Sequence, residues 1–144
     1  MQEEGNSETN RPIRVLVADD HTLFRRAIAG LLASYGGLEI IAQVLNDEGA
    51  LSIAQKEKPD VVLMQVQMPF ERSRESLEKL REISPAPKVV LVTMFEEPRY
   101  VRELMDLGTS AYLLKSASVA HLTGAVRVAV FDPEGHHVVE GMPQ

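Results

Sequence analysis

Short apolar runs alternate along the chain with longer stretches in which apolar and polar residues recur every three to four positions. The runs are rich in β-branched residues and nearly free of polar ones, which is typical of strands buried on both faces. Five of them predict strands, at Ile13–Ala18, Leu38–Leu45, Val61–Val66, Lys88–Thr93 and Ala111–Leu114.

The stretches between the runs predict five helices. Gly36–Gly37 can end the first, and Asp47 can cap a second that runs to about Lys58. Pro98 suits the first turn of the fourth helix, and Ser118 can cap the fifth. The apolar positions expected to face inward are Leu23, Phe24, Ala27, Ile28, Leu31 and Leu32 in the first helix, and Leu77, Leu80 and Ile83 in the third.

Strands that alternate with helices predict an α/β fold, a doubly wound parallel sheet with helices on both faces. We expect this domain to span residues 13–130. Residues 1–12 are polar and acidic and are expected to form a disordered tail, while residues 131–144, with Pro and Gly, are expected to be a linker or tail. In such sheets the ligand site lies beyond the carboxyl ends of the strands.

Composition narrows the classes of function. The chain of 144 residues has no Cys, which excludes thiol chemistry, and no apolar run long enough to span a membrane, so a cytoplasmic location is expected. The net charge of −6 argues against direct DNA binding by this segment, because duplex binding depends on clustered basic residues. Arg25–Arg26, Arg72 and Arg74 are too sparse to change this and are interpreted as exposed helical arginines.

Polar residues lie at or just after the carboxyl ends of four of the predicted strands. Asp19 and Asp20 come after the first, Gln65 lies near the end of the third, Thr93 ends the fourth and Lys115 follows the fifth. The fold would gather them at one edge, where two carboxylates, a hydroxyl and a lysine resemble a phosphoryl site that a hard cation such as Mg²⁺ suits. Taken singly, the acidic pair could instead cap a helix, and the Thr and the Lys could be structural or solvated.

Four segments carry a resemblance to a known family: VLVADDHTLFRRAI, PDVVLMQVQMP, VVLVTMF and GTSAYLLKSAS. Over roughly residues 12–130 they resemble the receiver domains of two-component response regulators, which are CheY-like. They look closest to the NarL/FixJ subclass, in which a LuxR-type helix-turn-helix follows. The resemblance implies a flavodoxin-like (βα)5 fold with strand order 2-1-3-4-5.

The resemblance also implies a role for each matching residue. Asp19 and Asp20 match the acidic pair that holds Mg²⁺, and the backbone carbonyl of Gln67 matches the third protein ligand of the metal. The switch and phosphate-contact positions are matched by the hydroxyl of Thr93, the aromatic ring of Tyr112 and the ammonium group of Lys115, and Met68–Pro69 match the residues that shape the loop after the acceptor.

The phospho-acceptor position itself departs from the pattern. Gln65 stands where the family has an aspartate nucleophile, and a neutral amide cannot form an acyl phosphate. One negative charge is lost, so Mg²⁺ affinity is expected to fall. The segment FERSRES replaces the small residues and glycine usual after Met68–Pro69, which we interpret as a rebuilt loop. The carboxylates of Glu71, Glu96 and Glu97 are poorly placed for in-line attack.

The leading hypothesis is therefore an atypical receiver, not an enzyme, that acts in signal transduction and transcription regulation without aspartyl phosphorylation. Its protein partner or second copy would dock on the fourth helix, fifth strand and fifth helix, with contacts from Arg99, Tyr100, Arg102, Glu103 and Asp106. One alternative is the regulatory half of a LuxR-type DNA-binding transcription factor controlled by a small ligand. Another is a phosphatase-like enzyme with Asp19 as nucleophile.

Overall fold

The computed structural model describes residues 11–66, 69–94, 98–131 and 138–140. The strands are β1 (Ile13–Ala18), β2 (Leu38–Val44), β3 (Val61–Gln65), β4 (Lys88–Thr93), β5 (Ala111–Leu114) and β6 (Val138–Glu140). The helices are α2 (Thr22–Ser34), α3 (Asp47–Glu57), α4 (Phe70–Arg81), α5 (Pro98–Asp106) and α6 (Val119–Phe131). The five predicted strands and five predicted helices are all present, with ends that differ by a few residues.

All strand pairs of the sheet are parallel, in the order β2-β1-β3-β4-β5-β6. The predicted order of the first five strands is confirmed. The sixth strand corrects the expectation that residues 131–144 are only a linker or tail, because Val138–Glu140 pairs with Ala111–Leu113 of β5. A strand of three residues is too short to show periodicity, so sequence reasoning missed it.

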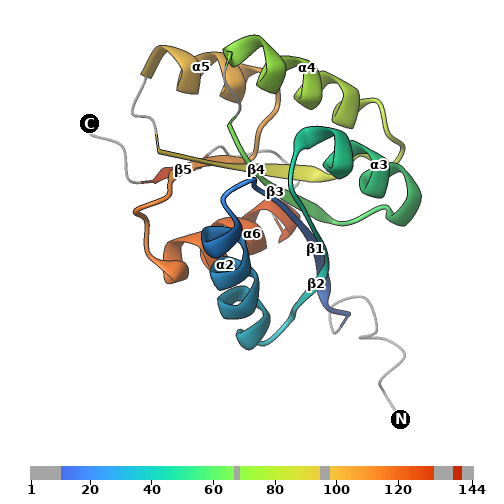
Figure 1. Ribbon diagram of the computed structural model, residues 1–144, viewed down its shortest axis with the longest axis vertical. Helices are drawn as coiled ribbons and strands as arrows, with labels where there is room; N and C mark the ends of the chain where they lie inside the picture. The colour runs from blue at the N-terminus through green and yellow to red at the C-terminus, as the bar shows by residue number, and fades with distance from the viewer. Residues whose placement is uncertain (1–10, 67–68, 95–97, 132–137, 141–144) are drawn as a thin grey trace.

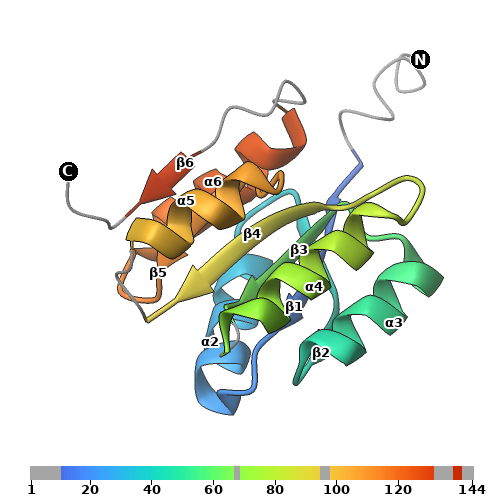
Figure 2. The ribbon, with the colours of Figure 1, turned by 90° about the horizontal axis from the view of Figure 1, so that it is seen from above.

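Two helical layers cover the sheet (Figures 1 and 2). Helices α2 and α6 lie side by side on one face, where residues such as Ile28, Leu32, Leu122 and Val126 form one core. Helices α3, α4 and α5 cover the other face, where Leu77 and Leu104 belong to a second core. Among the described residues no helix is both long and apolar enough to cross a membrane.

Helix α2 is rotated relative to the predicted apolar face. Leu23 is 77% exposed and Leu31 is 46% exposed, although both were expected to face inward. Arg25, expected to be exposed, is buried, and its guanidinium group donates to the backbone oxygen of Asp19 at 3.0 Å. Apolar residues in this helix cover a wider arc than the sheet can bury, so periodicity alone does not settle which part faces inward.

The ends of the helices explain two further differences from the prediction. The cap of α3 is Asn46, whose side chain accepts a hydrogen bond from Gly49 N at 2.8 Å, whereas Asp47 is the first helical residue. The segment FERSRES is not a loop, because α4 begins at Phe70. Ser118 does cap α6, as predicted, by accepting from His121 N.

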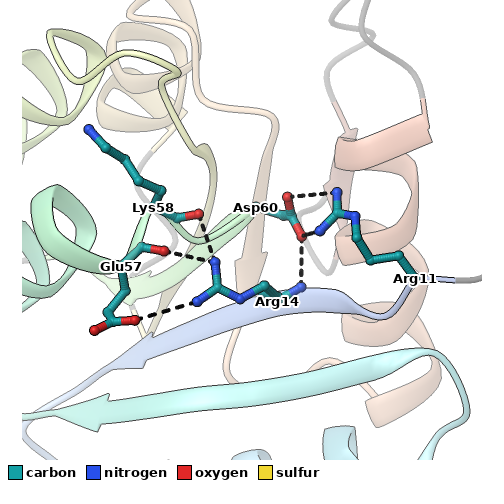
Figure 3. A network of polar contacts seen from close by, with 5 residues as sticks. All are labelled: Arg11, Arg14, Glu57, Lys58 and Asp60. Atoms are coloured by element: carbon teal, nitrogen blue, oxygen red, sulfur yellow. Dashed lines mark hydrogen bonds and ion pairs between the residues drawn. The ribbon is translucent and has the colours of Figure 1, made fainter. Parts of the chain in front are cut away.

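The amino edge of the sheet is held by a polar network around Asp60 (Figure 3). Its carboxylate accepts from Arg14 N at 2.8 Å and from the guanidinium group of Arg11 at 3.1 Å. Arg14 in turn donates to the backbone oxygens of Glu57 and Lys58, at the end of α3. The network therefore ties the start of β1 to the end of α3, at the opposite edge from the polar residues described next.

Candidate functional site

The carboxyl edge of the sheet gathers the polar residues singled out from the sequence. Asp19 directly follows β1, Gln65 ends β3, Thr93 ends β4 and Lys115 directly follows β5. Because these strands are parallel neighbours, their ends meet at one edge. The backbone joins two of them directly, since Lys115 N donates to Thr93 O at 2.7 Å.

Asp19 and Lys115 form a buried ion pair. The Lys115 ammonium nitrogen lies 3.0 Å and 3.2 Å from the two carboxylate oxygens of Asp19. The side chain of Asp19 is 3% exposed and that of Lys115 is 12% exposed. One Asp19 oxygen also accepts from His21 N at 2.8 Å, and the Lys115 ammonium lies 4.5 Å from the centre of the Phe24 ring. The positive charge of Lys115 is thus already paired with the carboxylate of Asp19.

Gln65 is in contact with the acidic pair through its amide oxygen. Its Oε1 accepts a hydrogen bond from the backbone N–H of Asp20 at 2.6 Å. This bond joins the end of β3 to the loop between β1 and α2. The carboxylate of Asp20 belongs to an exposed residue, so its negative charge remains in contact with solvent.

Thr93 and Tyr112, which the sequence predicts as switch positions, are both buried. Thr93 is the last residue of β4, and Tyr112 lies in the middle of β5 with no exposed surface. Tyr112 packs in the core shared with α3, α4 and α5 rather than at the molecular surface. The ring of Tyr112 is therefore turned inward.

The oxygen donors at this edge bear on the Mg²⁺ site that the sequence implies. Both oxygens of Asp19 face Lys115, and Oε1 of Gln65 is occupied by the amide of Asp20. Gln67 and Met68 lie outside the described residues, within which no group of three or more acidic or histidine side chains could hold a metal ion. The side-chain oxygens of Asp19 and Gln65 thus already make contacts within the chain, which weakens their fit to a divalent ion, whereas the carboxylate of Asp20 stays exposed.

Arg25 is the residue at this edge that sequence reasoning missed. Its guanidinium group donates to Asp19 O at 3.0 Å and lies 3.3 Å from Oε1 of Gln43, so it links α2 to the ends of β1 and β2. In a sequence, a buried arginine among apolar helical residues looks the same as an exposed one. Only the directions of the neighbouring side chains in the structure show that Arg25 is buried.

An open hollow of about 390 Å³ adjoins Lys115. It is lined by residues from the ends of β4 and β5 and from the start of α2: His21, Phe24, Thr93, Met94, Leu114, Lys115 and Ser116. The hollow has both apolar walls and polar groups, which is the usual make-up of a small-molecule site.

Known proteins resemble this chain over most of its length. The family model for the response regulator receiver domain matches residues 15–127 of this chain. The response regulator GacA of Pseudomonas viridiflava is 41% identical over 116 residues, which cover 81% of this chain and 54% of that protein. The response regulator protein VraR of Staphylococcus epidermidis is 32% identical over 127 residues, covering 85% of this chain and 61% of that protein. The chain thus spans about half the length of the curated relatives it matches.

Solved structures agree with the observed topology. The receiver domain of NarL from Mycobacterium tuberculosis superposes with a TM-score of 0.78 and 26% identity, covering 84% of this chain and 98% of that one. A LuxR-family DNA-binding response regulator from Staphylococcus aureus gives a TM-score of 0.74 and 27% identity, covering 81% of this chain and 98% of that one. The strand order, the strand-end residues at one edge and these matches all agree. The chain therefore belongs to the family of response regulator receiver domains.

Proposed function

We propose that this receiver domain signals without aspartyl phosphorylation, through the binding of a protein partner or a second copy. The observation that carries the proposal is the hydrogen bond of 2.6 Å from Asp20 N to the amide oxygen of Gln65. An amide oxygen in that bond is neutral and weakly nucleophilic, so it cannot displace a leaving group from a phosphoryl donor. The chain thus keeps the fold of a receiver domain but lacks the nucleophilic carboxylate oxygen at position 65.

The ion pair supports the same proposal. In a phosphorylated receiver the lysine would have to bind the phosphoryl group, as an ammonium point charge does. Here Lys115 is 3.0 Å from a buried carboxylate, and turning it away would leave Asp19 uncompensated. The charge of Lys115 is therefore balanced by Asp19 within the chain, so the lysine is not left free to bind a phosphoryl group.

The partner surface expected on α5, β5 and α6 is supported only in part. Tyr100 stacks on Phe70 of α4 with ring centres 4.5 Å apart, and Glu103 pairs with Arg74 of α4 at 3.4 Å. These side chains therefore serve contacts with α4. Arg102 and Asp106 of α5 are exposed and stay available for a partner.

A second candidate function is the regulatory half of a longer DNA-binding transcription factor controlled by a small ligand. It is favoured by relatives about twice as long and by the hollow beside Lys115. The source gene downstream of residue 144 decides it: an in-frame helix-turn-helix supports this function, and a stop codon removes it. The phosphatase-like alternative requires Asp19 to act as a nucleophile, and turnover of an aryl phosphate that is lost in Asp19→Asn would establish it.

Incubation with acetyl phosphate and Mg²⁺, followed by intact mass spectrometry, tests the proposal. We expect no phosphoryl adduct on the wild-type chain. The variant Gln65→Asp, which restores a carboxylate at the end of β3, is the matched control and is expected to gain a phosphoryl group. A stoichiometric adduct on the wild-type chain would overturn the proposal.

A further inference from the structure

The side chain of Asp47 is buried, although it lies outside the site formed by Asp19, Gln65, Thr93 and Lys115. Asp47 is the first residue of α3, which follows β2 at the carboxyl edge of the sheet. Only 9% of its side chain is exposed. Because Asn46 caps this helix instead, capping does not account for the buried carboxylate.

The two oxygens of the Asp47 carboxylate differ in their contacts. Oδ2 accepts a hydrogen bond from the hydroxyl group of Ser76 at 2.5 Å, which holds the carboxylate between α3 and α4. Oδ1 is buried and has no hydrogen-bond partner in the described part of the chain. The guanidinium group of Arg72 lies 3.8 Å from Oδ1, beyond hydrogen-bond distance, and the Arg72 side chain is 50% exposed. A buried carboxylate oxygen without a donor is unfavourable, so Oδ1 is suited to accept a hydrogen bond from a ligand.

Asp47 lines a hollow of about 130 Å³ between α3 and α4. The two helices lie side by side on the same face of the sheet (Figures 1 and 2). The other lining residues come from both helices: Glu48, Leu51, Arg72, Glu75, Ser76 and Lys79. At about 30 Å³ for each water molecule, the hollow holds about four of them. Only a small ligand therefore fits.

The hollow is lined by charges of both signs. Asp47, Glu48 and Glu75 bring carboxylates, while Arg72 and Lys79 bring cationic groups. Glu48 and Glu75 are exposed, so the charge of the buried Asp47 is the least screened by water among the three carboxylates. An ammonium group suits Asp47 Oδ1, because it is a compact cation with three donor hydrogens. A carboxylate on the same ligand suits the Arg72 guanidinium group, which can donate to both oxygens at once.

A ligand with a single charge would match only part of this hollow. Two positive and three negative side chains give the lining a net charge of −1, which opposes a simple anion. A metal ion is also disfavoured, because no three acidic or histidine side chains of the described residues are grouped to hold one. Leu51 adds an apolar wall, which suits a short aliphatic side chain. The lining therefore favours a small zwitterion.

We infer that the hollow between α3 and α4 binds a small free α-amino acid, with its ammonium group on Asp47 and its carboxylate on Arg72. This inference goes beyond the proposed function, because it holds whether or not Gln65 accepts a phosphoryl group. The site shares no lining residue with the hollow beside Lys115. A bound amino acid bridges α3 and α4, which gives the domain a chemical input that needs no phosphorylation.

Titration of the full chain with each of the common α-amino acids, followed by two-dimensional NMR of the amide groups, tests this. The amide signals of Gly49 and Ser76 report on the two sides of the Asp47 carboxylate. We expect saturable shifts of both signals with at least one small amino acid. Acetate and methylammonium each carry only one of the two charges and should bind at least tenfold more weakly. The inference fails if no amino acid gives saturable shifts, or if acetate or methylammonium alone binds as tightly.

Substitutions at the two ends of the hollow locate the ligand. Asp47→Asn keeps the shape of the side chain and removes its charge, and Arg72→Gln removes the cation at a half-exposed position that folding does not depend on. Each should raise the Kd for the amino acid at least tenfold in the same titration. The controls Glu78→Gln and Arg81→Gln remove the same charges at exposed positions of α4 outside the hollow, and should leave the Kd unchanged. An unchanged Kd in either Asp47→Asn or Arg72→Gln would overturn the inference.

Discussion

The ion pair between Asp19 and Lys115 makes a strong prediction for Lys115→Met, which keeps the aliphatic stem and removes the charge. Asp19 would remain buried with one described partner for its carboxylate, the His21 amide at 2.8 Å. Removing one member of a buried ion pair costs about 3–5 kcal/mol. The Lys115 side chain keeps 12% exposure and the Arg25 guanidinium group lies nearby, so the lower end, about 3 kcal/mol, is expected.

Urea denaturation followed by far-ultraviolet circular dichroism measures this loss, since the chain has no Trp for fluorescence. With an m value of about 2 kcal/mol/M, the midpoint should fall by about 1.5 M at unchanged m. The double variant Asp19→Asn with Lys115→Met removes both charges and should be more stable than Lys115→Met alone. The control Lys79→Met, at an exposed position of α4, should change stability by less than about 0.5 kcal/mol.

Two results would refute the reasoning. The first is a Lys115→Met chain within about 1 kcal/mol of the wild type, below the range for a broken buried pair. The second is a double variant less stable than Lys115→Met, which would mean that the Asp19 carboxylate is stabilising even without its lysine.

Three further substitutions test the packing and the helix ends by thermal and urea denaturation. Asn46→Ala removes the cap of α3 and should cost about 1 kcal/mol, whereas a neutral result would show that the bond to Gly49 N contributes nothing. Phe70→Ala removes a buried ring stacked on Tyr100 and should cost about 3–5 kcal/mol; a loss below about 1 kcal/mol would mean that α4 and α5 do not depend on the stack. Gly108→Ala forces a Cβ onto a backbone with φ of +97° and should lower stability by about 1 kcal/mol or more, while an unchanged melting temperature would contradict the left-handed turn after α5.

The sheet was predictable because its five main strands are short apolar runs separated by helical stretches. Parallel order then brings Asp19, Gln65, Thr93 and Lys115 to one edge without any knowledge of side-chain contacts. The roles predicted for these residues, for Tyr112 and for Gln67 await experiment. The expected cytoplasmic location also stays a prediction.

What the sequence could not indicate depends on side-chain direction and on short segments. Leu23 and Leu31 fit the helical period as well as Ile28 and Leu32 do, and only packing against the sheet shows which pair is buried. The segment that begins at Phe70 looked like a rebuilt loop because it lacks glycine, yet Phe70 is a core residue at the start of α4. The pairing of Lys115 with Asp19 depends on side-chain directions that the sequence does not show.

Two-dimensional NMR of the amide groups, recorded with and without Mg²⁺ and a beryllofluoride phosphate mimic, tests the central claim most directly. The Lys115 amide, bonded to Thr93 O, and the Asp20 amide, bonded to Gln65 Oε1, report on the site itself. If Gln65 makes the site inert to phosphoryl chemistry, neither signal moves in the wild type, and both move in Gln65→Asp. Saturable shifts of both signals in the wild-type chain would contradict it.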